Sequence, residues 1–123
     1  MNILAIDYGI KRIGLAWVES GLGVVLPFGV IDGKDKMKKI ISILHEEHID
    51  KIIIGFPINS DGSDTNVTSA VDEFIVLLES QISISIERVD ERFTTAQAKR
   101  MGGDATMDEK AAMLILQSYI DRR

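Results

Sequence analysis

Cysteine is absent from the 123-residue sequence, which excludes disulfides, thiolate metal ligands and cysteine nucleophiles. A chain without cysteine agrees with a reducing compartment, and no export signal precedes the first strand-like residues. No apolar run is long enough to cross a bilayer, so we expect no membrane partner. These absences together lead us to expect a cytoplasmic protein.

Several common motifs of catalysis and binding are also missing. There is no Gly-x-x-x-x-Gly-Lys-Ser/Thr phosphate loop. His45 and His48 are three residues apart, whereas the His-Glu-x-x-His zinc motif needs a separation of four. Asp61 and Asp64 lie in a Gly/Ser loop without the glutamate that a calcium loop requires. None of these patterns therefore accounts for a function.

Positive charge is in deficit, with 14 Lys and Arg against 19 Asp and Glu, a net charge of −5. This balance counts against a nucleic-acid partner, since such proteins usually present a basic face. Phosphate binding depends on local charge, however, and bound metal cations would reverse the sign at an acidic site. The chain has 123 residues and contains neither repeats nor a linker, which predicts one domain over residues 1–123.

The hydrophobic pattern changes its period along the chain. Residues 36–47 and 66–79 have helical spacing, and two more helices should begin at Thr94 and Thr106, each followed three residues later by Gln or Glu. The predicted strands are 2–7, 13–19, 23–32, 50–56 and 82–89. This order predicts an α/β fold: a mixed five-stranded sheet, three antiparallel strands followed by parallel crossovers, with helices on both faces.

Acidic residues end two of the predicted strands. Asp7 ends the first strand, which is apolar on both faces, so this strand should be central and the carboxylate should lie at the rim of the core. A role in the turn is the simpler alternative for Asp7. Asp90 and Glu91 end the last strand, and alternation sends their side chains to opposite faces. We favour Glu91 for a shared site because its side chain is longer, with Asp90 as the alternative.

A third acid, Asp108, lies in the first turn of the last predicted helix. Ala112, Ile115 and Tyr119 follow it at i+4, i+7 and i+11, which puts the carboxylate at the start of the stripe that faces the sheet. The helix dipole would explain an acid in this turn, but not its place on the buried side. Three converging carboxylates suit one or two Mg²⁺ or Mn²⁺ ions, which could flank a scissile phosphate.

Four sequence blocks extend this interpretation, because in this order they are specific to one family. The chain resembles the YqgF/RuvX type of ribonuclease H-like proteins, known as Holliday junction resolvases and as pre-16S rRNA processing nucleases. The blocks are DYGIKRIGLA at 7–16, GFP at 55–57 with NSDG at 59–62, DERFTT at 90–95, and DEKAA at 108–112 leading into ILQ at 115–117. The resemblance implies a single ribonuclease H-like nuclease domain over the whole chain.

The resemblance also implies a site and a substrate. Its catalytic and metal-binding acids fall on Asp7, Glu91 or its neighbour, and Asp108. The implied activity is a metal-dependent endonuclease that processes the 5′ end of pre-16S rRNA, or alternatively a resolvase of branched DNA, which would need a homodimer. The implied nucleic-acid contacts are Lys11, Arg12, Arg92, Thr94, Thr95 and Lys110.

One departure from the family keeps other hypotheses open. Family members usually carry a longer, basic segment before the final helix, where this chain has only residues 98–105. The short segment and the acidic balance favour a non-catalytic binding module as one alternative, although all three acids are retained. A phosphate-binding ATPase of the actin type is another, but that type needs two lobes of this kind.

Overall fold

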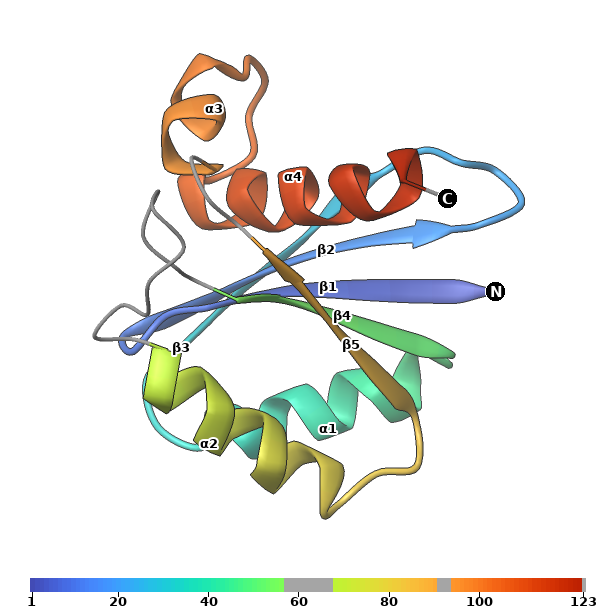
Figure 1. The fold of residues 1–123 in the computed structure, drawn as a ribbon, viewed down its shortest axis with the longest axis vertical. Coiled ribbons are helices and arrows are strands. Elements are labelled where there is room, and N and C mark those ends of the chain that lie inside the picture. The colour runs from blue at the N-terminus through green and yellow to red at the C-terminus, as the bar shows by residue number, and fades with distance from the viewer. Residues whose placement is uncertain (57–67, 91–93, 123) are drawn as a thin grey trace.

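The computed structural model describes residues 1–56, 68–90 and 94–122, with the side chains of 56, 68, 90 and 94–96 left out of the description. Five strands and four helices follow in the predicted order βββαβαβαα, which confirms the α/β prediction (Figure 1). The strands are β1 (Asn2–Tyr8), β2 (Arg12–Glu19), β3 (Leu26–Asp32), β4 (Lys51–Phe56) and β5 (Ser85–Asp90). The helices are α1 (Lys36–Glu46), α2 (Thr68–Glu79), α3 (Thr94–Arg100) and α4 (Met107–Asp121).

The strands form one mixed sheet in the order β3-β2-β1-β4-β5. β1 pairs antiparallel with β2 and parallel with β4, while β2–β3 is antiparallel and β4–β5 is parallel. β1 is therefore central, as its apolar faces predicted, and Ile3, Leu4, Ala5 and Ile6 are all 0% exposed. A strand buried on both faces has no polar side chain to offer until it reaches its end.

Helices cover both faces of this sheet (Figure 1). Leu4 and Ile6 point into a core with α1 and α2, whereas Ile3 and Ala5 point into a second core with α4. The α4 stripe predicted from sequence is buried, since Ala112, Ile115, Leu116 and Tyr119 all belong to this second core. α3 packs against α4 and lies outside the sheet. In the described part of the chain, none of the helices has the length and apolar character of a membrane span.

Two predicted strands begin three residues later than expected. The strand predicted over 23–32 begins at Leu26, because Gly23 has a φ of +72° and turns the chain away from extended geometry. Its Pro27 lies on an edge strand beside a register shift, where a missing N–H is tolerated. The strand predicted over 82–89 begins at Ser85, although Ile82 and Ile84 still pack against the core. The alternation of residues 82–84 therefore reflects their burial and not pairing with another strand.

Of the two predicted helix caps, the structure describes the one at Thr106 but not the side chain of Thr94. α1 ends at Glu46, one residue before the predicted end, and the first two residues of the helix predicted over 66–79 lie outside the described residues. At α4, Glu109 N donates to Thr106 Oγ1 at 3.1 Å and Thr106 N donates to Glu109 Oε1 at 3.0 Å. The predicted capping box is therefore confirmed at Thr106, and it fixes where α4 begins.

Candidate active site

The carboxyl ends of β1, β4 and β5 meet at one edge of the sheet, because these three strands are parallel. The register pairs Ile6 with Ile54 and Ile54 with Arg88, so the strands end level with one another. Asp7 follows Ile6 directly and is the first polar side chain of the central strand to reach this edge. In open sheets with this arrangement, functional sites form beyond the carboxyl ends of the strands.

Asp7 lies on the face of the sheet that α4 covers. Ile3 and Ala5 contact the α4 core, and side chains two residues apart along a strand share a face, so Asp7 continues this series. Its neighbours in sequence, Ile6 and Tyr8, contact the opposite core below the sheet. Asp7 is half-buried, which places the carboxylate at the boundary between core and solvent.

Gly14 lies next to both Asp7 and Asp108. It pairs with Asp7 across β1 and β2, and a Cβ built on it would lie 2.0 Å from the backbone oxygen of Asp108. Only a residue without a side chain lets the first turn of α4 approach β2 this closely. The structure therefore brings Asp108 next to the strand residue directly opposite Asp7, so two of the three predicted acids lie at the same place on the sheet.

Asp108 forms an ion pair with Arg12, a residue predicted to contact phosphate. Arg12 Nε donates to Asp108 Oδ2 at 2.9 Å, across 96 residues of sequence, and the two side chains are 55% and 31% exposed. Arg12 is the first residue of β2, two positions before Gly14. An ion pair this open to solvent adds little stability, so its main consequence is to hold the Asp108 side chain above the start of β2.

The other predicted site residues are placed as follows. Lys11 is exposed in the turn between β1 and β2. Lys110 is half-buried, and its Nζ donates to Met101 O at 3.0 Å, so it stabilises the connection from α3 to α4. Glu91 and Arg92 lie outside the described residues, and the side chains of Thr94 and Thr95 are not described. Within the described ranges, no group of three acids or histidines could hold a metal ion, so the described part of the site is the pair Asp7 and Asp108.

Sequence reasoning did not assign a role to Gly14, although a signal was present. A glycine inside a strand pattern indicates that another backbone approaches closely. Nothing local in the sequence says which backbone this is, because Asp108 lies far along the chain. The sequence analysis also assigns no role to the four lysines between residues 34 and 39.

The sheet order, the two helical layers and the acids at the carboxyl edge define the class of this protein as a ribonuclease H-like α/β domain. Solved structures agree with this fold. The chain matches Thermus thermophilus RuvC in complex with a Holliday junction substrate with a TM-score of 0.68 at 12% identity, over 99% of this chain and 96% of that one. It also matches the fowlpox virus Holliday junction resolvase with a TM-score of 0.60 at 13% identity, over 99% of each chain.

Sequence comparisons identify the family. The family model described as "RuvX: Holliday junction resolvase" matches residues 1–122. A protein of Chlorobium phaeobacteroides named "Putative pre-16S rRNA nuclease" is 35% identical, over 98% of this chain and 92% of that protein. One of the same name from Ruminiclostridium cellulolyticum is 36% identical, over 99% and 95%. The chain therefore belongs to the RuvX family, as the sequence blocks implied.

Proposed function

We propose that this protein is a divalent-metal-dependent endonuclease whose catalytic acids are Asp7, Glu91 and Asp108. That it is a nuclease follows from its family. The metal and the residues are the new part, and one observation supports them most. Gly14 lies directly opposite Asp7 and against the backbone of Asp108, so two carboxylates from opposite ends of the chain share the carboxyl edge of the sheet.

The residues at this edge fit a hard divalent cation. Asp7 and Asp108 are both half-buried carboxylates, and Mg²⁺ typically binds proteins through one or two carboxylates together with phosphate oxygens of the substrate. When bound, Mg²⁺ or Mn²⁺ supplies an activated water and charge stabilisation for the leaving oxygen. No side chain of the protein then has to act as a nucleophile.

For the third acid we propose Glu91, on the strength of the β5 alternation. Val89 is buried in the α4 core, the face that Asp7 also shares. Glu91 is two residues after Val89, and residues two apart along a strand share a face. If the alternation continues, Glu91 and not Asp90 is therefore the partner of Asp7.

Two cationic side chains, Arg12 and Lys11, are available to bind a phosphate of the substrate. Arg12 holds Asp108 through Nε, which leaves its terminal guanidinium nitrogens for a phosphate of the substrate. Lys11, exposed in the adjacent turn, adds a point charge at the same edge. We propose that these two residues orient the scissile phosphate, with Arg92, Thr94, Thr95 and Lys110 as further predicted contacts.

As substrate we propose the 5′ end of pre-16S rRNA, because relatives covering almost the whole chain carry that name. A branched DNA junction is the second candidate, and the family description together with the fold of RuvC favours it. Cutting both strands of a junction would require a two-fold homodimer, so resolvase activity and dimer formation should be found together or not at all.

Asp7→Asn tests the proposal. Purified protein is incubated with a pre-16S rRNA 5′ fragment or with a four-way DNA junction, in Mg²⁺, in Mn²⁺ and in chelator. We expect cleavage only with metal, and at least a 100-fold loss in Asp7→Asn. Asp121→Asn is the matched control, since it removes the same charge at the far end of α4, about 20 Å away along the helix. Cleavage that persists in chelator, or in Asp7→Asn at the rate of the control, would refute the proposed site.

A further inference from the structure

The positive charge of this acidic protein is unevenly distributed. Residues 1–45 carry six Lys and Arg against four Asp and Glu, whereas residues 46–123 carry eight against fifteen. The first part is thus net +2 and the second net −7. Four of these six cations fall within six residues, at Lys34, Lys36, Lys38 and Lys39, and we call them the β3–α1 lysines.

The β3–α1 lysines form no ion pairs with the residues that the structure describes. The ion pairs among the described residues involve the amino terminus, Arg12, Lys51 and Arg88 as cations. Two of the lysines instead bind backbone oxygens: Lys36 Nζ donates to Gly33 O at 2.8 Å and Lys39 Nζ donates to Asp32 O at 3.0 Å. Lys34 and Lys38 are exposed, with neither a hydrogen bond nor an ion pair in the described structure.

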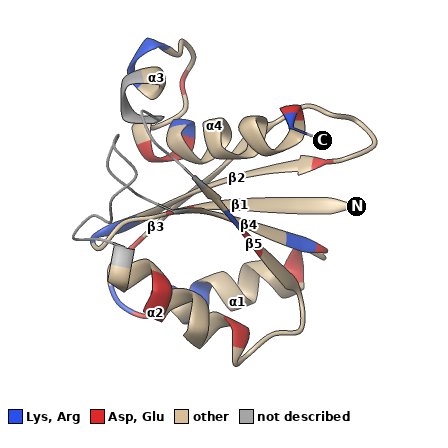
Figure 2. Ribbon diagram, in the orientation of Figure 1, with Lys and Arg blue, Asp and Glu red and all other residues tan. Residues whose placement is uncertain are grey.

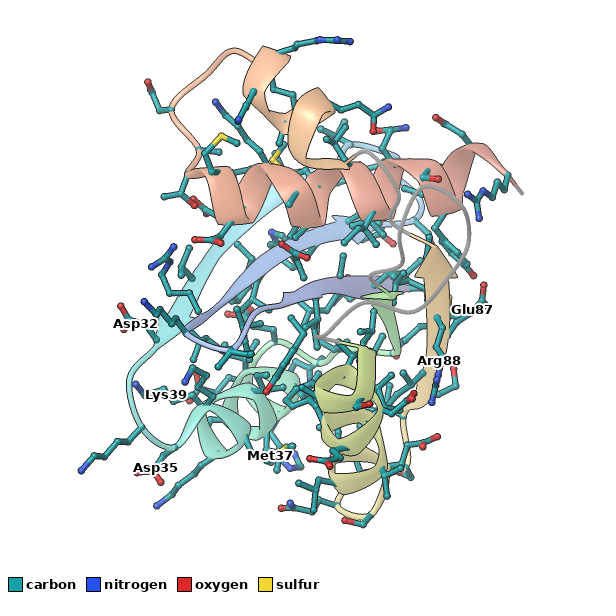
Figure 3. All side chains as sticks on the ribbon, turned by 60° about the vertical axis from the view of Figure 1, so that its left-hand side comes forward. Asp32, Asp35, Met37, Lys39, Glu87 and Arg88 are labelled. Carbon is teal, nitrogen blue, oxygen red and sulfur yellow. The ribbon has the colours of Figure 1, made fainter. Side chains whose placement is uncertain are left out.

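The lysines are positioned by the turn from β3 into α1. Gly33 has a φ of +77° and Asp35 a φ of 61°, so the chain reverses sharply before α1 begins. Figure 3 shows Asp32, Asp35, Met37 and Lys39 gathered where β3 ends and α1 starts, with Glu87 and Arg88 at the opposite side of the sheet on β5. Four lysines against Asp32 and Asp35 leave residues 32–39, at this corner of the molecule, with a net charge of +2.

This corner lies at the same edge of the sheet as the candidate active site. Arg12, which binds Asp108, pairs in register with Asp32 at the end of β3, directly before the turn. Figure 2 shows the basic segments of the β1–β2 and β3–α1 turns at the same end of the sheet as the acidic start of α4. A hollow of about 580 Å³ lies between the turn and α2, on the α1–α2 face of the sheet, and its charged lining residues are Lys34, Asp35, Lys36 and Glu73.

We propose that the β3–α1 lysines bind backbone phosphates of the substrate strand beyond the cleavage point. The inference rests on the proposed function, because a nuclease with a net charge of −5 needs a local basic surface to bind a polyanionic substrate. β1 and β3 are two strand spacings apart, about 10 Å, which corresponds to about three nucleotides of a strand. Phosphate contacts of this kind are independent of sequence and position the substrate, while the acids alone would repel it.

The test measures binding separately from cleavage. A fluorescein-labelled 20-nucleotide single-stranded RNA is titrated with protein in chelator at several salt concentrations. The double variant Lys34→Gln with Lys38→Gln removes two exposed charges that form no hydrogen bond or ion pair with the described residues. Its matched control, Gln81→Glu with Ser83→Glu, lowers the net charge by the same amount at exposed positions at the other end of the sheet. Circular dichroism confirms that both variants are folded.

For single strands, each phosphate contact contributes about 0.7 to the slope of log affinity against log salt. We therefore expect the lysine variant to lose about 1.4 from this slope and about tenfold in affinity at low salt, while the control keeps the wild-type slope. An unchanged slope in the lysine variant, an equal loss in both variants, or no binding by the wild type would each overturn the proposal. Failure of metal-dependent cleavage with the slope change present would instead refute only the nuclease site.

Discussion

Gly14 is the residue on which the placement of the two described acids depends. It pairs with Asp7, and its missing side chain admits the backbone of Asp108. Sequence alone predicted both acids at one edge of the sheet, since strand ends and helix stripes follow from local periodicity. It could not predict how closely α4 approaches β2, because that distance is set by packing between segments far apart in the chain.

Gly14→Ala should therefore separate the two acids. The added Cβ would lie 2.0 Å from Asp108 O, so the start of α4 must move. We expect a loss of about 1–3 kcal/mol in the free energy of unfolding, as for other overpacked sites. We also expect at least tenfold weaker Mn²⁺ binding, measured by calorimetry on the folded variant. Gly102→Ala is the control, because its Cβ would meet nothing within 4 Å. Wild-type Mn²⁺ affinity in Gly14→Ala would contradict this role.

At the scale of elements, hydrophobic periodicity predicted a strand correctly where the buried residues also pair with a neighbouring strand. It predicted a strand wrongly where residues are buried without such pairing. β1 was predicted as central because Leu4 and Ile6 face one core while Ile3 and Ala5 face the other. Ile82 alternates like a strand residue and does reach the core, but it does so from a loop. Side-chain alternation therefore predicts which residues are buried. It does not predict strand pairing, because pairing depends on whether another strand lies alongside.

The start of α4 is the element boundary that matters most for the site, since Asp108 lies in its first turn. Thr106 Oγ1 accepts from Glu109 N, and Thr106→Ala leaves that N–H without its partner. We expect a loss of about 1 kcal/mol in urea unfolding, as at other N-caps. Glu109→Gln should be nearly neutral because glutamine also completes a capping box. Equal losses in the two variants would indicate that the charge of Glu109, and not the cap, stabilises the helix.

At the scale of the whole molecule, the net charge and the local charge give opposite expectations about a nucleic-acid partner. The overall excess of acids argued against a polyanionic partner, yet the cations of residues 1–45 outnumber the acids there. The fold then places these cations at the same edge of the sheet as Asp7 and Asp108, because Arg12 at the start of β2 pairs in register with Asp32 at the end of β3. A composition cannot express this arrangement, because it depends on which strands are neighbours.

Stability should also depend on pH through the amino terminus. The Met1 ammonium donates to Glu19 Oε1 at 2.9 Å, and this hydrogen bond raises the pKa of the ammonium above 8.0 and lowers the pKa of the Glu19 carboxyl below 4.5. The contribution of Glu19 is complete above pH 4.5 and is lost as the pH falls through its lowered pKa. That of the ammonium is complete below pH 8.0 and is lost as the pH rises through its raised pKa.

Glu19→Gln should therefore lower Tm between pH 4.5 and pH 8.0, and this difference from the wild type should shrink on either side of that window. The effect is expected to be small, because both groups are exposed to solvent and screened by salt. Thermal melts from pH 3 to pH 10 at low salt would measure it, with Glu79→Gln as a control on the exposed end of α2. A Tm difference that is lost at low pH but persists undiminished at high pH would show that Glu19 acts through the hydrogen bond it accepts from Leu22 N and not through the ion pair that joins the start of β1 to the end of β2.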